Sequence, residues 1–315
     1  MPLYKCINLD QSNSTIIKED TQDGTTTVDI TSATESATSS SNEDWIKCIQ
    51  NQGEGVTELP SELTSIGDYA FEYCEKLALT KLPDGITSIG ENAFYECSSL
   101  ALTSLPKGVT VIGYDAFNSC TALTNIMIPP ALERLEDYAF GYCSSMTGDV
   151  YLPDTLTYFG SGVFAGTTGI TIKYIPSSLT NWGNYGVFSG VYVPMDVIPN
   201  TLTSTTSAMF SNSKIDWSTI PDSITTLGDS TFQQCSNITT MNIPVTITVL
   251  PEYVFSFCTG LTSVTFKGTL TSIAATAFAY CTNLTNIYVP WSEGTVADAP
   301  WGATNATIHY NAGVQ

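Results

Sequence analysis

The chain has 315 residues and is poor in histidine and in basic residues. It contains a single histidine, His309, and 10 Lys or Arg against 30 Asp or Glu, which gives a formal net charge of −20. Such a negative surface repels phosphate backbones and anionic lipids, so we expect neither nucleic acid nor a membrane surface as partner. A histidine-based catalytic site would have to use His309, and no GxSxG, HExxH, P-loop or dinucleotide-binding motif accompanies it. We therefore expect no enzyme and no cofactor.

Long hydrophobic runs are also missing. No apolar segment approaches the ~18 residues that a membrane span needs. The first 20 residues lack the basic region and following apolar stretch of a secretory signal. We expect no membrane insertion, and a chain that is either intracellular or carried outside by another route, such as on a particle.

Cysteine is present, but not in the spacing of a metal site. The chain has nine cysteines, no CxxC pair and no Cys/His cluster, so the sequence predicts no bound metal. Seven of them recur on a period of 23 residues, which continues without cysteine between Cys143 and Cys235. Equivalent side chains on stacked turns point in parallel, which is poor disulfide geometry, so we expect buried, reduced thiols. Cys6 and Cys48 lie outside this series and could pair with each other.

A phenylalanine three residues before each cysteine position marks the repeat more persistently. Its spacing is 22 to 24 residues from Phe71 to Phe278, and Trp301 follows after a further 23. Eleven or twelve residues before this aromatic, ten of eleven units carry a proline, which ends a strand because it cannot donate a ladder hydrogen bond. The residue before the proline position is always apolar, from Leu59 to Val289, and should face inward. Stacked units of this kind give parallel strands around one core.

The pattern LP..(I/V)TSIG..AF..C..L resembles the BspA-type leucine-rich repeat, over roughly residues 55–301. The resemblance implies a repeat solenoid, mainly β, with a parallel sheet on one face, about ten 23-residue units and capped ends. It also implies binding rather than catalysis. BspA-like proteins occur on surfaces of bacteria and some protists, where they bind host matrix proteins or other cells, and similar repeats occur in gut bacteria and their phages. The closing segment VPWSEGTVADAPWGATNATIHYN is similar to ends found in that last group.

These patterns divide the chain into four parts. Residues 1–44 are predicted to be an N-terminal tethering segment with a Ser/Thr-rich linker, TTTVDITSATESATSSS, and its first ~20 residues could form a small β element or a docking tag. Residues 45–54 should be an N-terminal cap, residues 55–289 the solenoid, and residues 290–315 a C-terminal cap. The predicted capping side chains are Trp45, Cys48 and Ile49 on a short helix, and Trp291, Trp301, Ile308 and Tyr310 at the other end.

The candidate binding residues lie in the middle units. Side chains two and four places before each proline position should point outward along the sheet, and in these units many are large and apolar. Exposed clusters of this kind mark interfaces, and Tyr or Trp also suits sugar rings. The predicted ligand-binding patch is Met127, Tyr151, Ile172, Tyr174, Met195, Val197 and Trp217. The alternative is a slipped register that turns some of them inward, as Lys173 and Asp196 at expected inward positions indicate.

The sequence therefore predicts a non-enzymatic recognition or structural protein on a virion or cell surface, with a protein or glycan on a cell surface as its partner. The lack of a recognisable secretory signal and the similarity of the closing segment favour a phage or prophage virion component (tail, baseplate or fibre). Such a component would contact other virion proteins through residues 1–44. A bacterial BspA-like adhesin is the alternative. A polysaccharide depolymerase is a third, in which carboxylates such as Glu133 with Glu136 and Asp137, or Asp149 with Asp154, would flank a sugar.

Overall fold

The computed structural model describes residues 63–312 continuously, five single positions between residues 53 and 61, and the backbone of three strands before them. It separates into two compact units. The first comprises Met1–Gly148 and Pro153–Tyr158, and the second comprises Asp149–Leu152 and Phe159–Gln315.

The N-terminal strands form an antiparallel sheet of their own. β1 (Tyr4–Asn8) pairs with β2 (Ser14–Asp20), and β2 pairs with β3 (Thr27–Thr31). β1 and β2 are the small β element that the sequence allowed there. β3 lies within the tract predicted to be a Ser/Thr-rich linker, and its Thr, Val and Ile are β-branched residues that favour a strand. The predicted helical cap around Trp45 and the Cys6–Cys48 pair lie outside the described residues.

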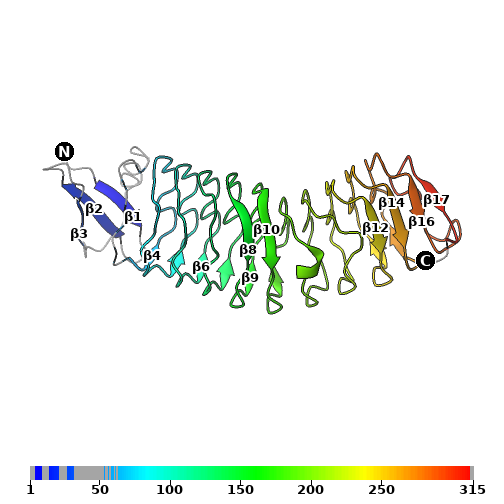
Figure 1. Cartoon of the computed structure of the whole chain (residues 1–315), viewed down its shortest axis with the longest axis horizontal. Coiled ribbons are helices and arrows are strands. Elements are labelled where there is room, and N and C mark those ends of the chain that lie inside the picture. Colours follow the sequence, from blue (N-terminus) through cyan, green and yellow to red (C-terminus); the bar gives the residue numbers. More distant parts are fainter. Residues whose placement is uncertain are drawn as a thin grey trace. The chain divides into compact units, whose positions relative to one another are not determined.

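The repeats of the first unit stack in strict register (Figure 1). Each contributes a two-residue strand after its proline position: β4 (Ser65–Ile66), β5 (Ser88–Ile89), β6 (Val111–Ile112) and β7 (Arg134–Leu135). The strands pair in parallel, and each residue lies opposite its equivalent one repeat later, as Ser65 does with Ser88. One period of sequence is therefore one turn of the fold.

The second unit has strands on both sides of the proline position. The described elements are β8 (Thr147–Tyr151), β9 (Tyr158–Phe159), β10 (Gly169–Tyr174), β11 (Asn181–Trp182), the 3-10 helix η1 (Met195–Val197), β12 (Thr240–Ile243), β13 (Val249–Leu250), β14 (Ser263–Phe266), β15 (Ser272–Ile273), β16 (Asn286–Tyr288) and β17 (Thr307–His309). β8 and β9 each run across the boundary between the units. β8 pairs with β10, β13 pairs with β15, and β12, β14, β16 and β17 form a four-stranded parallel sheet. From residue 63 to residue 312 the structure is a parallel-sheet β-solenoid, part of a fold of about 11 turns, with almost no helix among these residues.

A column of stacked phenylalanines forms the centre of the core. In the first unit each ring from Phe71 to Phe140 stacks on the next at 5.2 Å between centroids, and in the second unit the rings from Phe188 to Phe278 stack at 5.2–5.8 Å. A residue with positive φ stands two places before and two places after most of these rings, as Asn92 and Glu96 do around Phe94. These sharp bends turn the aromatic side chain inward. The predicted inward column before proline is buried throughout, except for the half-buried Ile128.

The seven repeat cysteines are buried free thiols, as predicted. Each Sγ after the first donates a hydrogen bond of 2.9–3.1 Å to a phenylalanine carbonyl of the preceding turn, as Cys97 does to Phe71. Burial raises the pKa of Cys143 and Cys235 to about 12. Between Cys143 and Cys235 the positions equivalent to the cysteines hold other small or branched residues, which are all buried: Thr167, Val191 and Ser213.

The C-terminal segment closes the second unit with one more strand. Trp291 and Trp301 are buried, and Trp301 accepts a hydrogen bond of 3.0 Å from the backbone N–H of Phe278. β17 extends the sheet beside β16, so the predicted cap carries part of a further turn. His309 stacks on Tyr288 at 4.5 Å, and its Nε2 lies 2.9 Å from Asn286 Oδ1. These contacts give the only histidine of the sequence a structural role.

Candidate recognition surface

Four of the seven predicted patch residues are exposed. Met127 is 71% exposed in the first unit. Tyr151, Tyr174 and Met195 are 60%, 43% and 39% exposed in the second unit. The outward orientation predicted for these four residues is confirmed. We call Tyr151, Tyr174 and Met195 the Tyr151 patch.

Neighbouring elements position the side chains of the Tyr151 patch. Leu152 is buried and donates its backbone N–H to the carbonyl of Tyr174 at 3.1 Å, so the residue before it on β8 points outward beside the end of β10. η1, which begins at Met195, lies beside β10. An exposed ion pair of 4.0 Å between Lys173 Nζ and Asp149 Oδ1 stands on the same strands. The result is a surface of two phenols, a thioether and one weak ion pair.

The prediction is wrong for Ile172, which is fully buried. β10 alternates correctly from Ile170 to Ile172, but Lys173 and Tyr174 are then both exposed before Ile175 turns inward. Two consecutive outward residues shift the alternation by one place, so counting backwards from the proline assigned the wrong face to Ile172.

The prediction is also wrong for Trp217, which is 2% exposed. Its Nε1 donates a hydrogen bond of 2.8 Å to the carbonyl of Val193, and its ring packs edge-on against Phe210 at 4.9 Å and Phe232 at 5.9 Å. The next residue, Ser218, is exposed where an inward residue was expected. The same one-residue slip therefore brings the indole into the core, and the slipped-register alternative is correct for Ile172 and Trp217.

Val197 is half-buried and the expected inward Asp196 is exposed, because Met195–Val197 forms a 3-10 helix in place of a strand. Tyr192, one turn further than Thr171, is half-buried as well. Burial and a hydrogen bond of 3.1 Å to Asp216 Oδ1 raise the pKa of Tyr192. This phenol therefore stays protonated over the neutral range and acts as a fixed donor.

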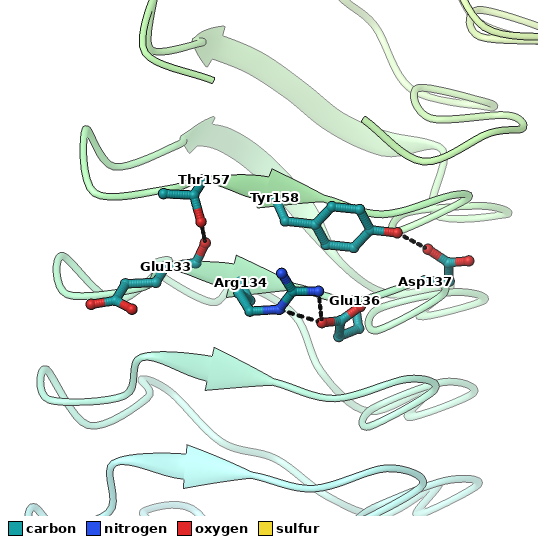
Figure 2. Close-up of polar contacts among 6 residues, drawn as sticks. All are labelled: Glu133, Arg134, Glu136, Asp137, Thr157 and Tyr158. Atoms are coloured by element: carbon teal, nitrogen blue, oxygen red, sulfur yellow. Dashed lines mark hydrogen bonds and ion pairs between the residues drawn. The ribbon is translucent and has the colours of Figure 1, made fainter. Parts of the chain in front are cut away.

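Two of the carboxylates considered for a depolymerase site, Glu136 and Asp137, are engaged with other side chains (Figure 2). Arg134 donates to Glu136 Oε1 through Nε at 2.8 Å and forms an ion pair with it through Nη2 at 2.7 Å. Tyr158 donates its hydroxyl to Asp137 Oδ1 at 3.0 Å, and burial together with this hydrogen bond raises the pKa of the phenol to about 12. Figure 2 shows the carboxylates of Glu133 and Asp137 at opposite ends of β7. Glu136 is therefore paired within its own turn, and Asp137 accepts a hydrogen bond from the next turn.

Sequence reasoning missed an open groove of about 610 Å³ on the first unit. It runs across β4, β5 and β6 and is lined mainly by Ser and Thr hydroxyls, glycines, Asp68 and Glu91. The available signal was the Ile-Gly dipeptide that recurs at Gly67, Gly90 and Gly113, because a glycine repeated at one place in every turn leaves a strip without side chains.

The part of the chain that the structure describes contains no group of His, Cys, Asp and Glu side chains suited to hold a metal ion. Across the same residues, no helix combines the length and the apolar character needed to traverse a bilayer.

Comparison with known proteins gives a family and a set of related folds. The model of the BspA type leucine rich repeat region matches residues 64–193 and 185–299. A leucine-rich repeat protein from Bacteroides ovatus is similar in structure, with a TM-score of 0.57 and 23% identity over 82% of this chain and 85% of that chain. A leucine rich cell surface protein from Faecalibacterium prausnitzii aligns over 80% of this chain and 84% of that chain, with 25% identity and a TM-score of 0.49. A comparison with curated proteins gave no match.

Proposed function

Because this chain belongs to the BspA-type leucine-rich-repeat family, we propose that it is a non-enzymatic recognition protein that acts at a surface and binds a protein or glycan of a host cell. Repeats of this kind are typically binding scaffolds. Their turns share one core and leave a long outer surface for contacts.

The observation that carries the proposal is the Tyr151 patch. Its two tyrosines and its methionine are exposed on adjacent elements although the fold has inward positions for apolar residues. Tyrosine supplies a large, rigid and partly polar contact area, which suits both protein and sugar surfaces. Aromatic residues at the centre of an interface are the usual source of its binding energy.

The test removes the two phenol rings together. The double variant Tyr151→Ala, Tyr174→Ala should lose about 30-fold or more in affinity, since each truncation at an interface centre costs roughly 1–2 kcal/mol. The measurement is binding of the purified chain to a printed glycan array and to immobilised extracellular-matrix proteins.

The matched control removes two exposed tyrosines elsewhere in the second unit, Tyr253→Ala and Tyr280→Ala. Both variants should keep the parent circular-dichroism spectrum and melting temperature. Equal binding by the two double variants would remove the Tyr151 patch from the proposal.

Two settings are compatible with this role. The closing segment favours a virion component (tail, baseplate or fibre) held by residues 1–44, and family membership is equally compatible with a cell-surface adhesin. Immunogold labelling of the source cells, and of particles released after prophage induction, distinguishes them. Label on tails or baseplates supports the first setting, and label on the cell envelope alone supports the second.

A further inference from the structure

The groove on the first unit has a floor that the fold keeps free of side chains. A Cβ on Gly90 would lie 2.6 Å from the backbone N of Asp68, and a Cβ on Gly113 would lie 2.6 Å from the carbonyl carbon of Gly90. Real Cβ contacts are essentially never this short, so close stacking of the turns requires glycine here. The trough follows from the repeat itself and is preformed.

One wall of the groove carries two carboxylates that are held in place. Asp68 Oδ1 accepts the backbone N–H of Glu91 at 2.8 Å, and Glu91 Oε1 accepts the hydroxyl of Tyr69 at 2.5 Å. This hydrogen bond, with burial and nearby carboxylates, raises the pKa of Tyr69 to about 12, so the phenol remains a donor. Among the described residues neither carboxylate forms an ion pair with Lys, Arg or His.

The fourth turn shows how a cation fits this trough. Arg134 is the only arginine of the chain, and it stands in register with Val111, which lines the groove. Two residues later Glu136 takes the place that glycine holds in the three preceding turns. The guanidinium pairs with Glu136 at 2.7 Å, and its Cζ lies 4.6 Å from the ring centroid of Tyr158 (Figure 2). Carboxylate and ring together hold a guanidinium at the end of the strip.

We propose that the groove over β4, β5 and β6 binds basic side chains of an extended peptide segment in a partner protein. The fixed carboxylates of Asp68 and Glu91 supply the charge complement, and the hydroxyls of Thr64 and Ser88 can accept the remaining N–H donors. The net charge of −20 attracts such a segment at long range. The site lies in the first unit and does not rest on the function proposed for the Tyr151 patch.

The experiment measures fluorescence anisotropy of three labelled synthetic peptides of equal length, made of alternating Ser with Arg, Gln or Glu. The Arg peptide should bind the full chain, more weakly at higher salt, and the Gln and Glu peptides should not. The variant Asp68→Asn, Glu91→Gln keeps an amide oxygen at the place of each accepting carboxylate oxygen and should weaken the Arg peptide about tenfold. Ser88→Arg places an arginine in the groove at the position that Arg134 holds in the fourth turn, and it should abolish binding of the Arg peptide.

The control is Asp222→Asn, Asp229→Asn, which changes the net charge equally with exposed residues of the second unit. It should bind the Arg peptide within about twofold of the parent chain, since charges outside the groove act only through the screened field. Equal losses in the two double variants would show that only the general charge of the chain attracts the peptide, and would overturn the proposal. Binding of the Gln peptide, or displacement of the Arg peptide by a neutral oligosaccharide, would overturn it too. A thermal melt confirms that each variant is folded.

Discussion

Trp217 offers the sharpest test of whether the irregular turns were assigned to the right face. Its side chain is almost wholly buried, and it contacts Phe210, Phe232 and the carbonyl of Val193. A buried indole removes about 200 Å² from water, and Trp→Ala substitutions in cores cost about 3–5 kcal/mol. We therefore expect Trp217→Ala to lower the free energy of unfolding of the second unit by that amount.

A second variant separates packing from hydrogen bonding. Trp217→Phe keeps much of the ring packing but removes the Nε1 donor, which leaves the Val193 carbonyl without this partner. The expected cost is about 1–3 kcal/mol. The measurement is a urea titration followed by tryptophan fluorescence and by circular dichroism, because a repeat protein can unfold in parts and the two signals then diverge.

Tyr151→Ala is the control for this series, because that side chain is exposed and its loss should change stability by less than about 0.5 kcal/mol. If Trp217→Ala left the urea midpoint unchanged and instead reduced ligand binding, the inward assignment would be refuted. The binding residue predicted from the sequence would then be restored.

Two further predictions concern the stacking of the turns. The folded pKa of Cys143 lies near 12 and its ordinary value near 9, so the stability of the fold should decrease as the pH rises from about 9 to 12. Urea midpoints across this range should fall less steeply in the variant Cys143→Ser, which places at this position the residue found at the buried Ser213. An equally steep fall in that variant would contradict this cause. Gly113→Ala should cost at least about 2 kcal/mol, because its Cβ would overlap the backbone of Gly90, whereas Gly108→Ala, whose nearest neighbour would be 3.8 Å away, should be nearly neutral; equal melting temperatures for the two variants would contradict the close stacking.

The regular features of the fold could be predicted from the sequence because the same residue types recur at the same positions in successive repeats. The phenylalanine column, the apolar residue before proline and the buried thiols all follow from one period of 23 residues. The face of the side chain four places before the proline position could not be predicted by counting, because two consecutive outward residues reverse it. The same reversal buries Leu79 and Leu102 in the regular first turns. Ile172 and Trp217 were misassigned in this way.

The candidate sites divide in the same manner. Tyr151 and Tyr174 could be found because each stands directly before a reliable inward residue, Leu152 and Ile175. The groove at Gly90 was missed because its floor consists of glycines, and the recurring Ile-Gly dipeptide is its only mark in the sequence. It depends on how closely one turn approaches the next, which is a property of the stacked backbone.

The thiol hydrogen bonds have a consequence for how such a chain can change in length. Cys120 donates to the carbonyl of Phe94, and Cys143 donates to that of Phe117, so each turn presents the same acceptor and the same donor to its neighbours. If recombination removed the 23 residues from 98 to 120, Cys143 would meet the Phe94 carbonyl as Cys120 does now. The turns are in this sense interchangeable. Gain or loss of a whole 23-residue period changes the number of stacked turns and preserves the hydrogen bonds between them.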